Sequence, residues 1–267
     1  CKFLSKDIVN VAPEAGQFFF QELQDIPSMP HPLMSADGYP PCEMNPAQGE
    51  SAEQIEAMGW AILSEVMLGE FRLVTFAGNL TRGTSAMCRV SSSYIGVFKD
   101  EEFIGVIRSA GEQDTYIGGM GFIQDGVVRL SSGDFISTPT ADIRVIDDTL
   151  TFGPLSDFTS HCGGQSVVPN VIGQSIIEGR EVLFSHGFRP AKTSPVDWNP
   201  EARLQANGIS EVETCSQGPG YCMFLYEDDH SRVSVVTQGQ QEFPNVLRFW
   251  VECKNSQPPP RDPEFLR

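Results

Sequence analysis

The fold is decided by the stretch YIGVF-KDEE-FIGVI, which spans Tyr94–Ile107. Two short runs of aromatic and β-branched residues flank four charged residues, which is typical of antiparallel strands joined by a hairpin. The arrangement recurs at Asp125-Gly126, between GFIQ and VVRL, and at Asp147-Asp148, between IRVI and TLTF. An Asp-Gly pair tolerates the positive φ that tight hairpins require. The segment 71–152 therefore predicts a meander of about six to eight antiparallel strands.

A helix is predicted before this meander, from Ser51 to Leu68. Ser51 could cap it, with Gln54 at the capping-box position, and Gly69 could end it. Its apolar residues approximate a helical stripe, namely Ile55, Met58, Ile62, Val66 and Met67. One helix packed on an antiparallel sheet predicts an α+β or small barrel-like domain over residues 51–164.

A second, smaller α+β domain is predicted over residues 165–254, after the boundary signal Gly163-Gly164. A short strand and a turn precede a helix that begins with the capping box of Ser175 and Glu178 and ends at Gly187. Four apolar runs then predict strands, namely EVETC, YCMFLYE, RVSVVTQ and NVLRFWVEC.

The first half of this domain resembles a PASTA module, whose repeats open with a VPxVxG motif, a helix and a Gly-hydrophobic pair. The matching residues are Val168, Pro169, Val171, Gly173 and Gly187-Phe188. Residues 168–253 as a whole are similar to uncharacterised bacterial secreted domains. That similarity is carried by Gly187-Phe188-Arg189-Pro190, by the turn 218–222 and by the strand 235–239. The resemblance implies an extracytoplasmic, non-catalytic module and, through PASTA, recognition of cell-wall muropeptides, with no binding residues carried over.

The composition is that of a globular protein, with 40% hydrophobic residues among 267. Its 35 acidic and 18 basic residues give a net charge of −17. This charge argues against a nucleic-acid partner, because binding phosphate needs basic patches. It suits either a cationic partner or simple solubility.

Cysteine usage indicates an oxidising compartment. Seven cysteines are present, and setting Cys1 aside leaves six, enough for three disulfides. No CxxC or CxxCH motif occurs, so we predict no zinc site, no haem and no other cofactor. Cys215 and Cys222 flank a Gly-Pro-Gly turn and are expected to pair. We then expect Cys42 to pair with Cys88 and Cys162 with Cys253, the last bridge joining the two domains.

The first residue, Cys1, suggests a bacterial lipoprotein, in which a cysteine carries acyl chains. Lys2 and Lys6 could meet anionic headgroups. The alternative is that the chain starts at this cysteine for an unrelated reason. Residues 1–50, rich in proline, are expected to form a tether, and residues 255–267 a proline-rich tail.

A catalytic alternative rests on Asp157, Ser160, His161 and Cys162. A nucleophilic cysteine needs a nearby histidine and a third group to orient it. Neighbouring strand residues point to opposite faces, however, and a disulfide at Cys162 would consume the thiol. We therefore predict no enzymatic activity and keep a secreted cysteine- or serine-type hydrolase as a second alternative.

The expected function is that of a lipid-anchored accessory subunit of a membrane protein complex, on the periplasmic or cell-surface face of a bacterial membrane. The expected partner contacts are Phe18, Phe19 and Phe20 in the tether and Pro258, Pro259, Pro260 and Phe265 in the tail. Docking of the three phenylalanines onto their own domain stays open. The first alternative is a peptidoglycan-binding module.

Overall fold

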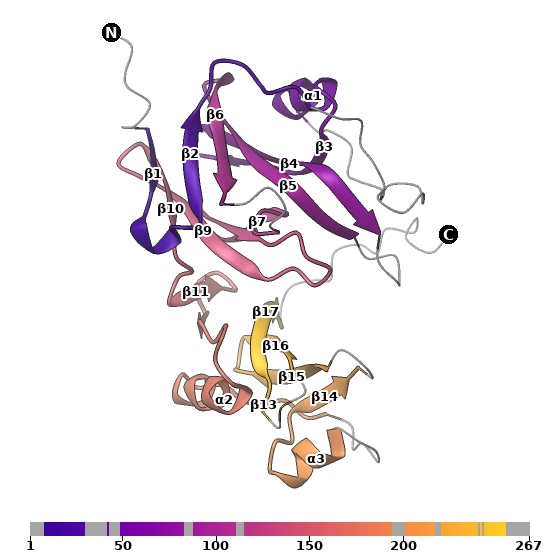
Figure 1. Ribbon diagram of the computed structural model, residues 1–267. Coiled ribbons are helices and arrows are strands. Elements are labelled where there is room, and N and C mark those ends of the chain that lie inside the picture. The colour runs from indigo at the N-terminus through magenta and orange to yellow at the C-terminus, as the bar shows by residue number, and fades with distance from the viewer. Residues whose placement is uncertain are drawn as a thin grey trace, which may run out of the picture. The chain divides into compact units, whose positions relative to one another are not determined.

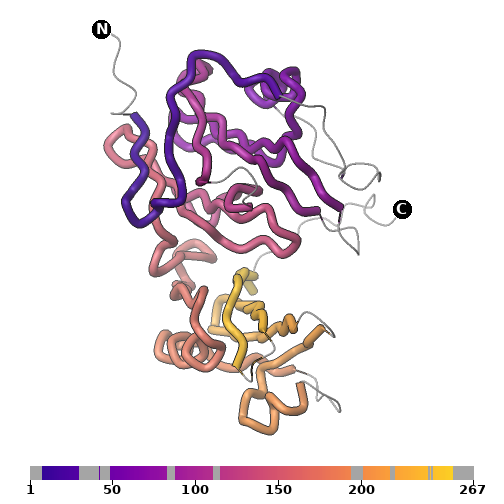
Figure 2. The backbone as a smooth tube through the Cα atoms, viewed as in Figure 1, coloured from indigo at the N-terminus to yellow at the C-terminus, as the bar shows by residue number. Residues whose placement is uncertain are grey.

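The computed structural model describes residues 8–29, 42, 49–82, 88–110, 115–193, 201–216, 220–239, 241 and 243–254. The chain divides into two compact units, one ending at Ser156 and the other starting at Asp157. Figure 1 labels their elements, and Figure 2 traces the path of the chain within each unit. The hairpin that contains Gly163-Gly164, where the sequence places the boundary, belongs to the second unit.

Two five-stranded sheets make up the first unit. In the first sheet, all neighbours are antiparallel and the order is β2-β6-β5-β4-β3. Its strands are β2 (Phe18–Glu22), β3 (Ala61–Leu68), β4 (Phe71–Arg82), β5 (Cys88–Lys99) and β6 (Glu102–Ser109). The turn between β5 and β6 has positive φ at Asp100 and Glu101, which confirms the hairpin predicted within Tyr94–Ile107.

The second sheet has the order β1-β10-β9-β8-β7, and among the described strands only β1 runs parallel to its neighbour. Its strands are β1 (Val9–Val11), β7 (Met120–Gln124), β8 (Val127–Ser131), β9 (Pro139–Ile146) and β10 (Thr149–Gly153). Asp125-Gly126 and Asp147-Asp148 form the predicted turns. The predicted meander is therefore seven strands, β4 to β10, divided between two sheets.

Apolar side chains from both sheets form one core, to which Leu73 and Ile95 contribute from the first sheet and Leu130 and Ile143 from the second. A separate cluster packs on the other face of the first sheet, where α1 (Glu50–Ala57) contributes Ile55. The first sheet is thus buried on both faces, which explains why β4 is buried continuously from Leu73 to Ala77 rather than at alternate positions.

The prediction of one helix over Ser51–Leu68 is wrong in its second half. Helix α1 ends at Ala57, and Gly59 has a φ of +95°, which ends the helical path. Residues 61–68 form β3 instead, because they pair with β4 along its free side and become the outermost strand of the first sheet. The N-cap is Gly49, so Ser51 is a buried residue inside the helix and not its cap.

The predicted tether over residues 1–50 is also wrong for its described part. Val9–Val11 forms β1, a short 3-10 helix η2 (Pro13–Ala15) follows, and Phe18–Glu22 forms β2. Strand β1 is the outermost strand of one sheet and β2 is the outermost strand of the other. Val9 and Phe18 are buried in the core.

The second unit is a small α+β domain. Its main sheet has the order β13-β15-β16-β17, with β14 also paired to β15, and β11 and β12 form a separate hairpin. The elements are β11 (Phe158–His161), β12 (Ser166–Pro169), α2 (Ile176–Ser185), β13 (Arg189–Pro190), α3 (Glu201–Ala206), β14 (Val212–Cys215), β15 (Tyr221–Glu227), β16 (Ser231–Gln238) and β17 (Asn245–Cys253). Helix α2 begins with the predicted capping box of Ser175 and Glu178, and the four predicted strands are β14 to β17.

Three disulfides connect the six described cysteines in the predicted pairs. The Cα–Cα distances are 6.0 Å for Cys42–Cys88, 5.5 Å for Cys162–Cys253 and 4.0 Å for Cys215–Cys222. The sequence predicts that the Cys162–Cys253 bridge joins the two domains, and this is wrong. Both cysteines lie in the second unit, so the bridge stabilises that unit alone.

Candidate binding groove between two sheet edges

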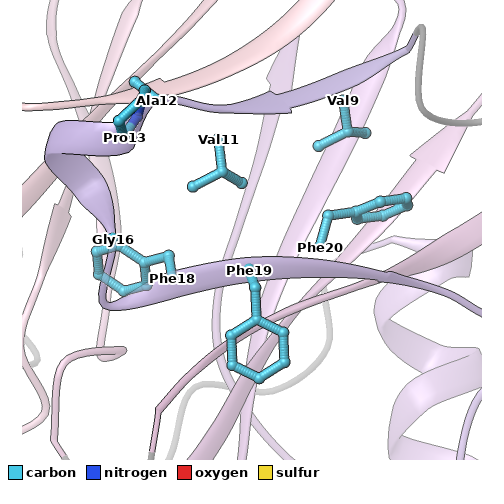
Figure 3. Close-up of a pocket in the computed structure, with 8 residues that line it drawn as sticks. All are labelled: Val9, Val11, Ala12, Pro13, Gly16, Phe18, Phe19 and Phe20. Carbon is cyan, nitrogen blue, oxygen red and sulfur yellow. The ribbon is translucent and has the colours of Figure 1, made fainter.

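A groove of about 340 Å³ lies between β1 and β2 (Figure 3). Val9 and Val11 extend from β1 toward β2, Phe20 extends back toward Val9, and Phe19 points away. The groove is lined by Val9, Val11, Ala12, Pro13, Gly16, Phe18, Phe19 and Phe20. The side chains that line it are therefore apolar and continuous with the core of the first unit, and backbone groups supply the polar part of its walls.

Backbone groups of β2 point toward the groove from an unpaired edge. The Gln17 carbonyl accepts from the Ala110 N–H, and the Leu23 N–H donates to the Ile104 carbonyl, so odd-numbered residues of β2 bond to β6. Because bonded positions alternate in an antiparallel ladder, the N–H and C=O of Phe18 and Phe20 point to the opposite edge. No strand in the described part of the chain pairs with that edge.

The edge of β1 is arranged in the same way. The Ile8 carbonyl accepts from the Leu150 N–H, and the Ala12 N–H donates to the Phe152 carbonyl. The backbone groups of Val9 and Val11 thus point away from β10. Two sheet edges, one from each sheet, therefore flank the same groove.

Gly105 holds β2 close to its neighbour β6. Its φ is +151°, and a Cβ there would lie 2.4 Å from the Gln21 carbonyl oxygen and 2.8 Å from the Phe20 ring. Only glycine fits between these atoms, so this residue fixes the position of the phenylalanines that line the groove.

Two partly exposed aromatic rings adjoin β2. Phe19 is 36% exposed, with the Arg108 guanidinium 4.4 Å from its ring centroid. Tyr116 is 45% exposed and meets the ring of Phe18 edge-on at 6.3 Å. Exposed aromatic rings beside an apolar groove are typical of protein-binding surfaces.

The expectation that Phe18, Phe19 and Phe20 form one exposed cluster needs correction. Phe18 is 3% exposed and belongs to the core, and Phe20 packs against that core. Alternation along β2 turns only Phe19 to the outer face. Val9 and Val11 are groove residues that the sequence-based prediction of a tether did not include, although their alternation with Asn10 is a strand signal.

The proposed cysteine nucleophile is excluded, since Cys162 is bonded to Cys253. The nearby His161 lies with Nε2 2.8 Å from the Thr159 hydroxyl on the same hairpin. The cluster on which the catalytic alternative rests therefore has no free thiol at Cys162, and the serine-type form of that alternative stays untested.

A buried ion pair stabilises the second sheet of the first unit. Asp142 is fully buried and accepts two hydrogen bonds from Arg129, at 2.8 and 2.9 Å, and one from the Ser156 backbone N–H at 2.8 Å. Burial alone would raise the pKa of Asp142, but the bonds from Arg129 and Ser156 outweigh it and lower the pKa. The carboxylate is thus held charged and has a structural role.

Ionisable groups in the second unit are likewise engaged internally. Burial, followed by the charge of Glu211, raises the pKa of the Tyr226 hydroxyl, and Arg180 pairs with Glu211 at 2.6 Å. Desolvation opposes ionisation of Asp228, but bonds from Ser166, His230 and Ser231 lower its pKa. These bonds fix the hairpin between β15 and β16.

Several predicted site residues lie outside the described residues. These are Cys1, Pro258, Pro259, Pro260 and Phe265. Lipidation of Cys1 and partner contacts in the tail therefore stay predictions. Within the described ranges, no helix is long and apolar enough to cross a membrane, and no three His, Cys, Asp or Glu side chains gather as metal ligands would.

Comparison with known proteins gave no relative. No protein-family model, no curated protein and no solved structure matches the chain.

Proposed function

We propose that this protein is a non-catalytic binding protein of an extracytoplasmic compartment, and that it holds a partner protein at the surface made by the groove and Phe19, called here the β1–β2 surface. The observation that carries the proposal is the apolar groove between two unpaired sheet edges. Edges of this kind attract other polypeptides unless they are covered.

The compartment is supported by the three disulfides. Disulfides persist in oxidising environments and are rare in the cytosol. The finer expectation, an accessory subunit of a membrane protein complex anchored through Cys1, stays a prediction. Intact-mass measurement of the native protein tests it through the added mass of acyl chains.

Substitution of Phe19 tests the β1–β2 surface. Phe19→Thr keeps a residue that suits a strand and removes the exposed ring, and Phe122→Thr is the matched control. Phe122 is also an exposed ring on an edge strand, β7, at 55% exposure. Native proteins that copurify with the wild type should bind Phe19→Thr at least about tenfold more weakly and the control equally well.

Equal recovery with both variants, with each shown to be folded by its circular dichroism, would place the contacts elsewhere and overturn the proposal. The recovery is quantified against the wild type at equal protein concentration.

A further inference from the structure

We propose that the occupant of the groove is an extended strand of another protein, which adds to the free edge of β2 and carries apolar residues at alternate positions between basic flanks. This inference rests on the proposed function and names the chemistry of the partner.

The backbone of β2 requires an extended polypeptide. Phe18 and Phe20 present N–H and C=O groups at strand spacing along an edge that no described strand covers. Such a row is satisfied by another strand, as in β-augmentation. Of the usual protections against pairing, Phe18–Glu22 has no lysine, no proline and no bulge, and its one charged residue, Glu22, stands at the end of the strand.

The walls of the groove set the side-chain pattern of the guest. Val9, Val11, Phe18 and Phe20 line one side of the space beside the edge. A strand paired there turns every second side chain toward these walls, and those side chains have to be apolar. Its other side chains face away and are not restricted by the groove.

The charge of this surface determines which residues should flank the apolar stretch of the guest strand. It also argues against a second copy of this chain as the guest. The charged residues within Val9–Glu22 are Glu14 and Glu22, both acidic and both exposed. Glu22 already interacts within the protein, so exposed Glu14 and the net charge of −17 carry the choice, and complementary flanks are Lys or Arg. Two copies, each with a net charge of −17, repel one another.

The chain's own tail does not suit the edge either. Pro258, Pro259 and Pro260 lack backbone N–H groups, so this stretch cannot complete a ladder. A strand of another protein meets neither difficulty, because it can supply both a complete ladder and basic flanks.

Residue-resolved hydrogen exchange by NMR on the full chain tests the pairing. The probe is the synthetic peptide Lys-Val-Thr-Val-Thr-Val-Lys. In the protein alone, the Phe18 and Phe20 amides should exchange faster than those of Phe19 and Gln21, which are bonded to β6. Saturating peptide should slow exchange of Phe18 and Phe20 at least about tenfold and leave the other two unchanged.

Two N-methylated peptides provide the matched control. One carries N-methyl groups on its Val amides and the other on its Thr amides, so each blocks a different edge of the guest strand. Only one of the two should lose binding. A peptide with Glu in place of both Lys should bind several-fold more weakly, and the difference should shrink at high salt.

Four results would overturn the inference. They are absence of binding at millimolar peptide, binding without protection of Phe18 and Phe20, equal binding of both N-methylated peptides, and protection that rises with protein concentration in the absence of peptide. The last result would identify a second copy as the occupant. If native partners still depend on Phe19 while the peptide test fails, the β1–β2 surface stands and strand addition alone is wrong.

Discussion

Asp142 shows how a buried charge is stabilised inside the first unit. Its side chain is fully buried, and Arg129, which bonds it through two guanidinium nitrogens, is only 8% exposed. The pair joins neighbouring strands β8 and β9, where Arg129 and Asp142 are directly opposite. Desolvating both charges is costly, so the bonds are needed to keep the sheet intact.

Replacing Asp142 with Asn should destabilise the first unit by about 3–5 kcal/mol, because Arg129 is left as a buried and uncompensated charge. Urea unfolding at neutral pH measures this. Glu70→Gln is the matched control, since it also changes a carboxylate to an amide, but Glu70 is exposed where it meets Lys99 at 3.3 Å. It should change the free energy of unfolding by no more than about 0.5 kcal/mol. Equal effects of the two substitutions would contradict the role given to burial.

The same residue predicts a pH dependence. The pKa of Asp142 in the folded protein lies below its ordinary value of 3.8, through the bonds from Arg129 and Ser156 that outweigh desolvation. Its stabilising contribution is therefore complete above the unfolded pKa and is lost as the pH falls through the lower folded pKa. The difference in unfolding free energy between wild type and Asp142→Asn should be constant from about pH 5 to 7 and shrink below about pH 3. A difference that stays constant across this range would show that the carboxylate is not the cause.

At the scale of elements, Gly59 decides where α1 stops and β3 begins. The apolar residues after it are compatible with a helix by spacing alone, which is why the sequence predicts one. A φ of +95° at Gly59 is accessible to glycine and strained for other residues, so the chain leaves the helix there. Trp60 follows, and its indole N–H donates to the Pro27 carbonyl at 2.6 Å, which fixes the entry into β3.

Gly59→Ala should cost about 1 kcal/mol or more in stability, because alanine is strained at positive φ. Space is not the cause, since the nearest atom to an added Cβ is the Met29 Cβ at 3.5 Å, an ordinary contact. Gly119→Ala serves as control, because its φ is not in the left-handed region and no atom lies within 4 Å of the added carbon. Chemical denaturation of both variants should separate them. A stable Gly59→Ala variant would mean that the turn can relax without strain.

On the scale of the whole molecule, the disulfides act within units. Cys42–Cys88 belongs to the first unit, and the other two belong to the second. The sequence separation is 46 residues for Cys42–Cys88, 91 for Cys162–Cys253 and 7 for Cys215–Cys222. The bridges therefore differ in how much they reduce the entropy of the unfolded chain.

The loss of stability on removing each bridge, by substituting both of its cysteines with alanine, should increase with the length of the loop that the bridge closes. The expected losses are about 4.5 kcal/mol for Cys162–Cys253, about 4 kcal/mol for Cys42–Cys88 and about 2.5 kcal/mol for Cys215–Cys222. Calorimetry should show the Cys42–Cys88 variant with a lower transition for the first unit only, and the other two with a lower transition for the second. If removing one bridge lowers the transition temperatures of both units, the two units unfold together.

Turn chemistry explains how much of this fold is visible in the sequence. Asp125-Gly126, Asp147-Asp148 and the capping box at Ser175 act through neighbours in the chain, so the hairpins of the first unit and helix α2 could be predicted from sequence alone. The turn after Cys215 likewise predicts its bridge to Cys222, whereas the other two bridges join cysteines 46 and 91 residues apart and do not follow from any local signal. The sequence-based predictions are wrong where pairing with a strand from another part of the chain determines the local structure. Residues 61–68 are an example, because they form a strand through pairing with β4.

The sequence by itself determined a disulfide-bonded, acidic protein of two small sheet-rich domains, because strand periodicity, turns and charge are local properties. Only the tertiary structure decided that Phe18–Glu22 is an edge strand, that Phe18 is buried while Phe19 is exposed, and that β1 lies beside β2. Each of these depends on pairing with β6 or β10, whose residues are far away in the chain. The residues of the candidate site therefore all lie in the single stretch Val9–Phe20, but the groove exists only because β1 and β2 join the edges of two different sheets.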